Sequence, residues 1–532
     1  MISPRHETEV LIVGGGPVGM ALALDLAQRD VGCMVIEGGD GQVHHPKVST
    51  VGPRSMELFR RWGIADTIRG AGWPGSHPLD IAWVTQVGGY EIYRFERGTA
   101  DDRPEFRHTP EPDQICPAHW LNPLLMDAVG AYPDGPLRLR HRVDSFHQDD
   151  DGVTASITDM RTGEASAVRA GYLVACDGAA SPIRTACGIE APARHQAQVF
   201  RNILFRAPEL AEQLAARGSR SALVYFLMLS ASLRYPLRSL DGGDLFNLVV
   251  SGDTAAGDPL ALVKDAIAFE TPTDLLSDST WHLTHRVADG YRHGRVFLVG
   301  DAAHTLSPSG GFGLNTGIGD AADLGWKLAA QLAGWAGTEM LASYETERRP
   351  VALKSLDTAN TNLRRTMSRE LPADLRADSP DGELARTEMA ARLHESGARR
   401  EFDAPEAHLG FGYSSPLVVG ADTEISEHWR PGSDPGFRAA HGWLRPGVST
   451  LDLFGRGFVL LCFDDSDRLD GVERAFAERR VPLDVARCEN QEIAQLYRFP
   501  FVLVRPDGHV AWRSDQMPDD PRQLADVVRG AA

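Results

Sequence analysis

The pattern of apolar and polar positions at the start of the chain predicts a βαβ unit. Residues 9–13 are apolar and β-branched, residues 17–29 show helical periodicity, and residues 33–36 are apolar again. The runs 172–175 and 295–299 have the continuous apolar character of strands buried on both faces. A long helical pattern over residues 316–332 follows the second run. These segments predict one α/β nucleotide-binding domain.

Other segments show the different pattern of an antiparallel sheet, with residues 223–229 and 245–250 as the clearest strands. The pieces of the two predicted domains alternate along the chain. We therefore predict an α/β fold in which a Rossmann-like domain is interleaved with an antiparallel-sheet substrate domain. The Rossmann-like domain takes residues 1–75, 105–190 and 285–410, including a helical bridge, and the substrate domain takes residues 76–104 and 191–284.

A third pattern begins after residue 416 and predicts a separate α/β domain over residues 411–532. Strands are expected at 457–463 and 483–487, and a hairpin at 501–513 around Pro506-Asp507-Gly508. Helices are expected at 470–479 and 521–528.

Composition and charge exclude several classes of protein. The 532 residues have a net charge of −19, and no basic cluster is long enough to bind nucleic acid or an anionic membrane. No segment approaches the roughly 20 apolar residues of a membrane span. The six cysteines form no CxxC pair and no zinc-spaced cluster, so neither disulfides nor a metal is expected. We expect a cytoplasmic protein, either a monomer or a homodimer.

A glycine-rich turn follows the first predicted strand and opens the first predicted helix. Gly14, Gly16 and Gly19 occupy the three positions of GxGxxG, with Pro17 and Val18 between them. In such a turn the glycines allow close approach of a pyrophosphate, and the helix N-terminus attracts its charge. Glu37 ends the second strand, where a carboxylate can accept hydrogen bonds from ribose hydroxyls. The acid disfavours a 2′-phosphate, which leaves FAD or NAD as the bound dinucleotide.

A second glycine-rich segment follows the strand at 295–299. That strand ends in Gly300-Asp301, at the edge where open α/β sheets bind ligands. The loop that comes next feeds the long helix, whose positive N-terminus could face an electron-rich ring edge. Its residues run Pro308-Ser309-Gly310-Gly311-Phe312-Gly313-Leu314-Asn315. A cofactor contacted by both glycine-rich segments must be long.

These motifs resemble the class A flavoprotein aromatic hydroxylases, the para-hydroxybenzoate hydroxylase type, including polyketide hydroxylases. The likeness covers about residues 8–355. It rests on GxGxxG with Glu37, on the run from Tyr172 through Asp177-Gly178 to Arg184, and on the Gly300 to Asn315 segment.

The resemblance implies a role for individual residues. Asp301 would hold the ribityl chain of FAD, and the backbone of Leu314 and Asn315 would bind the flavin pyrimidine edge. The remaining cofactor contacts implied are Asp177 and Gly178 near the pyrophosphate and the approach of NAD(P)H, Arg54 near the pyrophosphate and flavin, Val143 beside the adenine, and Pro308 and Gly313 in the flavin loop. No catalytic residue is identified, although Arg54 and Pro308 are candidates.

Some positions depart from the family or have a less certain role. Ala118 stands where the family often has glutamine, so His119 or water would have to replace that contact. His304 fits a structural role better than that of a general base, which must reach the substrate proton. Tyr225, Tyr235 and Trp281, on the predicted substrate sheet, are expected to form pocket wall.

The C-terminal domain resembles a thioredoxin-like fold. Arg498-Phe499-Pro500-Phe501 is similar to the segment whose proline is cis in that fold. Where the fold places CxxC, this chain has Asp464-Asp465-Ser466. We therefore expect a packing or dimerisation role and no redox exchange.

The resemblance implies a single-component FAD monooxygenase for a small phenolic or polyketide-like substrate. NAD(P)H would reduce the non-covalently bound FAD, and O₂ would add at flavin C4a to give the hydroperoxide that oxygenates the ring. Only one dinucleotide fingerprint is present, so NAD(P)H would bind transiently. Two alternatives stay open: Baeyer–Villiger oxidation of a polycyclic ketone by the same flavin, and a non-catalytic flavoprotein sensor.

Overall fold

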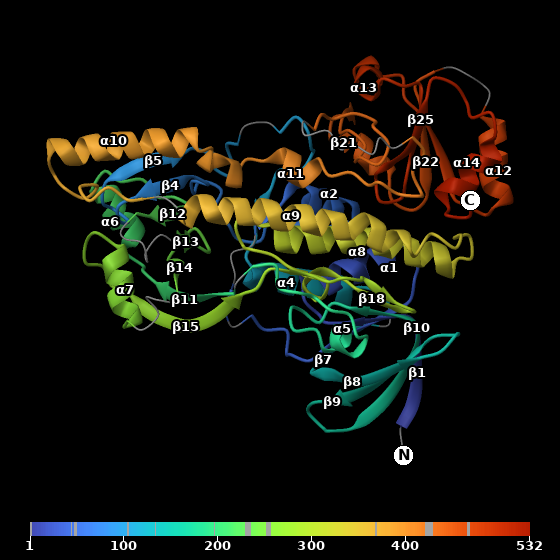
Figure 1. Ribbon diagram of the computed structural model, residues 1–532, viewed down its shortest axis with the longest axis horizontal. Coiled ribbons are helices and arrows are strands. Elements are labelled where there is room, and N and C mark those ends of the chain that lie inside the picture. Colours follow the sequence, from blue (N-terminus) through green and yellow to red (C-terminus); the bar gives the residue numbers. More distant parts are fainter. Residues whose placement is uncertain are drawn as a thin grey trace.

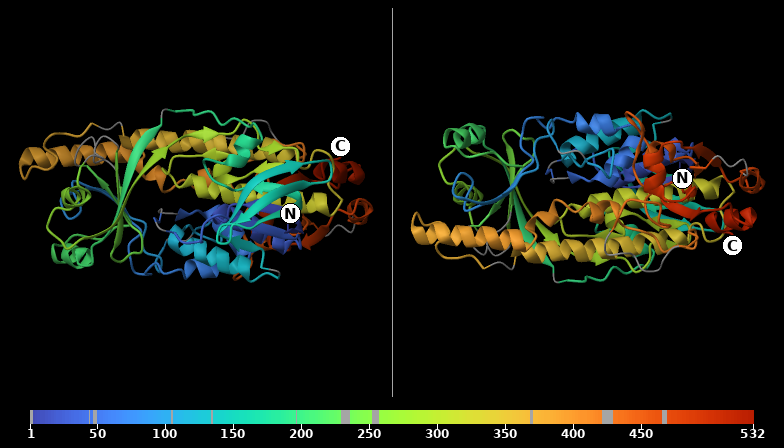
Figure 2. Two further views of the ribbon diagram at one scale, coloured as in Figure 1. Left: turned by 90° about the horizontal axis from the view of Figure 1, so that it is seen from below. Right: turned by 90° about the horizontal axis from the view of Figure 1, so that it is seen from above.

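The computed structural model describes residues 3–43, 45–46, 50–103, 106–133, 135–195, 197–228, 236–251, 257–367, 370–420, 429–464 and 469–532. In these ranges, three large sheets organise the α/β fold (Figure 1). The substrate sheet and the C-terminal domain lie at opposite ends of the molecule, and the Rossmann-like part lies between them (Figure 2).

The first sheet contains the predicted βαβ unit. Four parallel pairs join β18, β10, β1, β2 and β7, and a β8–β9 hairpin continues antiparallel from β10. Helix α1 (Pro17–Gln28) packs against β1, β2 and α8. The strands are β17 (Arg292–His293), β18 (Val296–Leu298), β10 (Ala165–Ala175), β1 (Ser3–Val13), β2 (Cys33–Glu37), β7 (Leu137–Leu139), β8 (His141–Gln148) and β9 (Val153–Asp159).

The second sheet carries the strands predicted for the substrate domain and is called the substrate sheet. It is mixed: β12 and β4 pair in parallel, and all other neighbouring strands of the sheet pair antiparallel. Helices α6 (Leu210–Ala216) and α7 (Pro259–Ala266) cover one face, and α10 (Pro380–Glu395) packs against the other. The strands in order are β15 (Asp274–Leu283), β11 (Gln198–Arg206), β14 (Leu245–Ser251), β13 (Pro236–Ser239), β12 (Val224–Leu227), β4 (Ile81–Val84) and β5 (Glu91–Phe95).

Two long helices run through the middle of the molecule and join its parts (Figure 1). Helix α8 (Phe312–Leu332) starts earlier than the periodicity predicts, because Gly311 adopts the left-handed conformation (φ 67°) and forms the N-cap. Helix α9 (Ser343–Met367) packs along α8. Shorter helices complete this part: α2 (Pro53–Arg61), α3 (Ala65–Arg69), α4 (Ala118–Gly130), α5 (Pro182–Ala186) and α11 (Pro405–Leu409).

The C-terminal domain has a four-stranded sheet in the order β23-β22-β24-β25, with one parallel pair and two antiparallel pairs. Its core continues onto α8, where Trp326 contacts Phe458. Residues 465 and 466, at the position expected for CxxC, lie outside the described residues. The elements are β22 (Phe458–Cys462), α12 (Asp470–Glu478), β23 (Leu483–Arg487), α13 (Gln491–Tyr497), β24 (Phe501–Val504), β25 (Val510–Ser514) and α14 (Pro521–Val528).

The structure also bears on the expected proline geometry of the C-terminal domain and on membrane spans. The described peptide bonds include no cis bond, so Pro500 is trans and departs from the thioredoxin-like pattern. None of the helices in the described ranges combines the length and apolarity needed to cross a membrane.

Candidate active site

The three glycines of the first motif meet different surroundings. A Cβ atom on Gly14 would lie 2.2 Å from the carbonyl oxygen of Cys176, and one on Gly19 would lie 2.0 Å from that of Gly14. These two glycines therefore let strand, turn and helix pack together. By contrast, a Cβ on Gly16 would have no atom within 4 Å. Gly16 thus faces open space at the N-terminus of α1, the place that a pyrophosphate needs.

Glu37 shapes the same turn. Its carboxylate accepts a hydrogen bond of 2.7 Å from the backbone N–H of Gly15 and one of 2.6 Å from that of Gly39. The side chain is only half-buried. A carboxylate offers about four acceptor positions, so both oxygens can still accept from ribose hydroxyls.

A cavity of about 440 Å³ begins at this turn and runs to the substrate sheet. It brings together residues from both glycine-rich segments, from α4 and from the loop after β10. Gly178 and Gly313, like Gly16, have open space where a Cβ would be. Of the residues predicted to contact cofactor, the cavity is lined by Gly16, Pro17, Val18, Gly178, Asp301, Pro308, Gly313 and Leu314, and Ala118 also lines it.

The first turn of α8 closes one end of the cavity. Asn315 does not line it but fixes this turn: its Nδ2 donates to the carbonyls of Gly311 (2.7 Å) and Thr50 (3.0 Å). Its Oδ1 accepts from the backbone N–H of Gly52 and the hydroxyl of Ser55, both at 2.7 Å. Gly311, Gly313 and Leu314, at the start of α8, line the cavity, and these hydrogen bonds hold the helix end in a fixed position beside it. Three open glycines, an exposed Asp301 and this positive helix end fit the long, anionic FAD.

Asp177 and Arg184 hold the loop after β10. Asp177 accepts from the hydroxyl of Ser181 (2.6 Å) and the N–H of Ile183 (3.2 Å), and burial raises its pKa. Arg184 is buried and donates to the carbonyls of Ala302 (2.7 Å) and Ala179 (3.0 Å). Arg184 thus ties the Gly178 loop to the turn that carries Asp301, a role that its place in the motif run did not reveal.

The far end of the cavity is formed by the substrate sheet. Trp281 lines it, stacks on Phe200 at 4.9 Å and donates its indole N–H to Asn202 (3.0 Å). Phe226 and Arg238 project from β12 and β13 into the same space. Burial lowers the pKa of Arg238, and the charge of Glu401 partly offsets this.

A second cavity, of about 500 Å³, continues from the first. Both are lined by Thr50, Arg238, Pro308, Gly311 and Glu401. The second also reaches Phe95 and Phe402, so apolar rings line the route beyond Pro308. A flat molecule larger than a single ring can therefore lie next to the flavin loop.

Two of the predicted site residues, Tyr225 and Arg54, lie outside this cavity. Tyr225 faces the opposite side of the sheet, because neighbouring residues of a strand alternate between faces and Phe226 points into the cavity. There it accepts a hydrogen bond from the N–H of Ala222, and burial raises its pKa to about 12. Arg54 also turns away from the cavity and donates to Glu57 (3.0 Å) and to the carbonyl of Asp507 (2.6 Å).

The remaining candidates have a less direct relation to the cavity. Val143 lies in β8, paired with Ile157, and does not line it. His304 is buried and pairs with Asp320 (2.7 Å), in agreement with the structural role expected for it. His119 adjoins Ala118 but does not line the cavity, and Tyr235 lies outside the described residues.

The chain matches two family models. Residues 7–239 and 260–359 match the FAD binding domain, and residues 433–531 match the C-terminal domain of aromatic-ring hydroxylases. The chain belongs to the FAD-dependent aromatic-ring hydroxylases. FAD is therefore its cofactor and O₂ the oxidant of its monooxygenase class. These matches confirm the resemblance and the fold class expected from the motifs.

Similar proteins cover almost the whole chain. Tetracenomycin B2 monooxygenase-dioxygenase from Streptomyces olivaceus is 34% identical, with 98% of each chain covered. The rebeccamycin biosynthetic enzyme RebC, solved with reduced flavin, is 62% identical at a TM-score of 0.96, with both chains fully covered. RebC has also been solved after soaking with chromopyrrolic acid, with a bound 7-carboxy compound. Aklavinone-11 hydroxylase with FAD and aklavinone is 29% identical at a TM-score of 0.83, with 99% of each chain covered.

Proposed function

We propose that this flavoprotein uses NAD(P)H and O₂ to insert one oxygen atom into a polycyclic aromatic substrate that carries a carboxylate. The observation that supports this most is the meeting of two cavities at Pro308 and Arg238. One is lined by the glycines and Asp301 that fit FAD, and the other by aromatic rings together with charged side chains, among them Arg97, Arg103 and Arg107. The substrate ring would therefore lie directly against the flavin loop.

The residues around the cavity have distinct tasks in this proposal. Gly16 and Gly178 leave room for the pyrophosphate, Asp301 accepts from the ribityl hydroxyls, and the N-terminus of α8 stabilises negative charge at the pyrimidine edge. FAD supplies the redox and oxygen chemistry when bound. The rings of Phe95 and Phe402 in the second cavity, and those of Trp281, Phe200 and Phe226 at the sheet end of the first, pack against the flat substrate and exclude water from it.

Arg238 is the residue that favours an acidic substrate. It is the basic side chain shared by both cavities, and its Nε has no hydrogen-bond partner among the described residues. A planar guanidinium binds a carboxylate through two parallel hydrogen bonds. The names of the compounds soaked into and bound by RebC, an acid and a 7-carboxy compound, agree with this chemistry.

The test compares polycyclic phenols that carry a carboxylic acid with their methyl esters. We expect NAD(P)H-dependent product formation with the acids, and a KM about ten- to a hundredfold higher for the acids in Arg238→Met, as expected for a lost charge-assisted hydrogen bond. The KM for the esters should stay unchanged. The matched control is Arg206→Met, which removes an exposed arginine from β11 that pairs with Asp244.

Two results would contradict the proposal. Equal losses for acids and esters in Arg238→Met would remove Arg238 from carboxylate recognition. Absence of oxygenated product with every compound, in a protein fully loaded with FAD, would refute the monooxygenase reaction itself. Nuclear magnetic resonance spectra of the product separate a ring hydroxyl from the ester of a Baeyer–Villiger oxidation.

A further inference from the structure

The hairpin turn between β24 and β25, residues 505–509, inserts the C-terminal domain among three helices of the FAD-binding part. Arg505, Asp507 and His509 are all buried in the turn, with side-chain exposures of 0–3%. The turn contacts α8 through Asp323 and α9 through Glu347. It contacts α2 through the carbonyl of Asp507, which accepts from Arg54 (2.6 Å) and Arg61 (3.3 Å).

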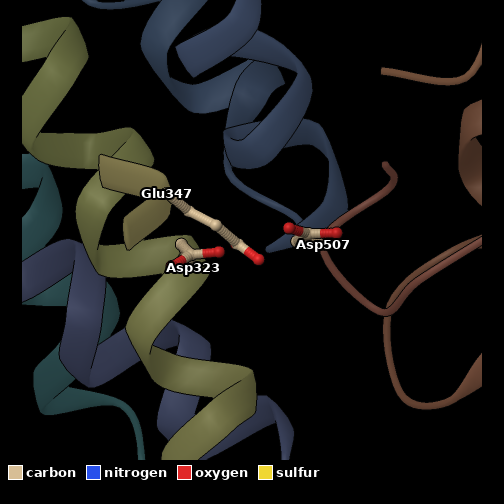
Figure 3. A group of neighbouring side chains, drawn as sticks. All are labelled: Asp323, Glu347 and Asp507. Atoms are coloured by element: carbon tan, nitrogen blue, oxygen red, sulfur yellow. The ribbon is translucent and has the colours of Figure 1, made fainter. Parts of the chain in front are cut away.

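A cluster of charges holds this junction together. The carboxyl groups of Asp323, Glu347 and Asp507 lie within 4.8 Å of one another (Figure 3). Arg505 donates to both oxygens of Glu347 (2.8 and 2.7 Å), to Asp323 (3.1 Å) and to Asp507 (2.7 Å). Lys327 donates to Asp323 and Glu347, both at 2.8 Å. Two cations thus satisfy the three acids and occupy the position that a metal ion would take.

Hydrogen bonds connect this junction to the turn that carries Asp301. On α8, Asp320 accepts from the backbone N–H of Gly300 (3.2 Å) and from Arg348 (2.7 Å). Arg348 also donates to the hydroxyl of Tyr413 (2.9 Å). The ring of Tyr413 lies 4.3 Å from that of His509 in the hairpin turn. Two buried side chains, Asp320 and Arg348, therefore link the Gly300-Asp301 turn to Tyr413, whose ring contacts His509 of the hairpin turn.

A second connection runs through α2. The N-terminal end of this helix is bonded to Asn315 of the flavin loop through Gly52 and Ser55. In the same turn of α2, between Gly52 and Ser55, Arg54 donates to the hairpin carbonyl. The hairpin therefore contacts α2, α8 and α9. The N-terminal end of α2 fixes the flavin loop, and side chains of α8 and α9 fix the Gly300-Asp301 turn.

We propose that the hairpin turn 505–509 is a positioning element of the FAD site, which sets the placement of α2, α8 and α9 and so the retention of FAD. The domain is also attached to α8 by apolar packing, in which Phe458 contacts Trp326. Buried ion pairs add little net stability compared with apolar contacts, because the charges must be desolvated. Buried ion pairs do require one fixed arrangement of the charged groups, and an element that positions helices needs such a fixed arrangement.

The test measures how fast FAD leaves the fully loaded holoenzyme after dilution, from the recovery of free-flavin fluorescence. Tyr413→Phe removes one hydroxyl and keeps the ring, so the protein should fold. We expect FAD release to become about two- to tenfold faster, the effect of one lost hydrogen bond. Arg505→Met should accelerate release further, and Arg505→Lys should partly restore retention because it keeps the charge.

The matched control is Arg479→Met. Arg479 forms a two-bond pair with Asp526 inside the C-terminal domain, away from the hairpin. This variant should lower the melting temperature and leave FAD release unchanged. If Tyr413→Phe releases FAD at the wild-type rate, or no faster than Arg479→Met, the positioning role is wrong and the domain only packs. Because Tyr413→Phe decides the question alone, failure of Arg505→Met to fold does not affect the outcome.

Discussion

The cofactor cavity and the hairpin junction of this flavoprotein use opposite means to fix their geometry. The cavity depends on backbone: Gly16, Gly178 and Gly313 leave space, and residues at the N-terminal ends of α1 and α8 line it. The junction depends on side chains, with Arg505 and Lys327 buried against carboxylates. The cavity must accept a large ligand, whereas the junction must hold helices in one arrangement.

The largest effect is expected from side chains added to the glycine turn. Gly16→Val should fold with the melting temperature of the wild-type apoprotein and lose FAD, because the new side chain fills the open space next to α1. Gly19→Val should fail to fold, since its Cβ would lie 2.0 Å from the carbonyl oxygen of Gly14. Circular dichroism and flavin absorbance distinguish the two outcomes. A Gly16→Val protein that retains stoichiometric FAD would show that the cavity is not the cofactor site.

The same contrast explains what the sequence could predict. The glycine motifs are local, so GxGxxG, Gly178 and the Gly300 to Asn315 segment could be recognised from adjacent residues. Strands β1, β2, β10 and β18 could also be predicted, because strands buried on both faces appear as continuous apolar runs. Most of the C-terminal elements follow from their own local patterns, and the hairpin from Pro506-Asp507-Gly508.

The side-chain contacts that could not be predicted join residues far apart in the chain. Arg54 lies in the first turn of α2, but its partner is the carbonyl of Asp507, more than 400 residues later. Arg238 belongs to no motif, and only the pairing of β13 with β12 and β14 places it in the cavity. Tyr225 was expected to form pocket wall, but it lies on the face of β12 opposite the cavity, because one residue of register decides the side.

A smaller effect is expected for the pH dependence of the free energy of unfolding, through two histidines of the C-terminal domain. Burial lowers the pKa of both His441 and His509 to about 4. In the unfolded chain these pKa values return to about 6.5, so between pH 6.5 and 4 the unfolded state binds more protons. The free energy of unfolding should therefore be highest above pH 6.5 and fall toward pH 4, by at most about 1.4 kcal/mol per pH unit for each histidine.

Urea unfolding at pH 7.5 and pH 5 measures this dependence. His441→Gln keeps a polar group beside Ser449, its partner at 2.8 Å, and should reduce the loss of stability at pH 5. An unchanged difference between the two pH values in this variant would show that His441 does not carry the effect.

The most direct test of the account is the fate of molecular oxygen. The FAD-loaded protein is given NAD(P)H, ¹⁸O₂ and a carboxylated polycyclic phenol, and the product is analysed by mass spectrometry. We expect one ¹⁸O atom per product molecule, in amounts that depend on substrate, NAD(P)H and bound FAD. Product oxygen that comes from water, or NAD(P)H oxidation that yields only hydrogen peroxide with every aromatic acid, would contradict the proposed monooxygenation.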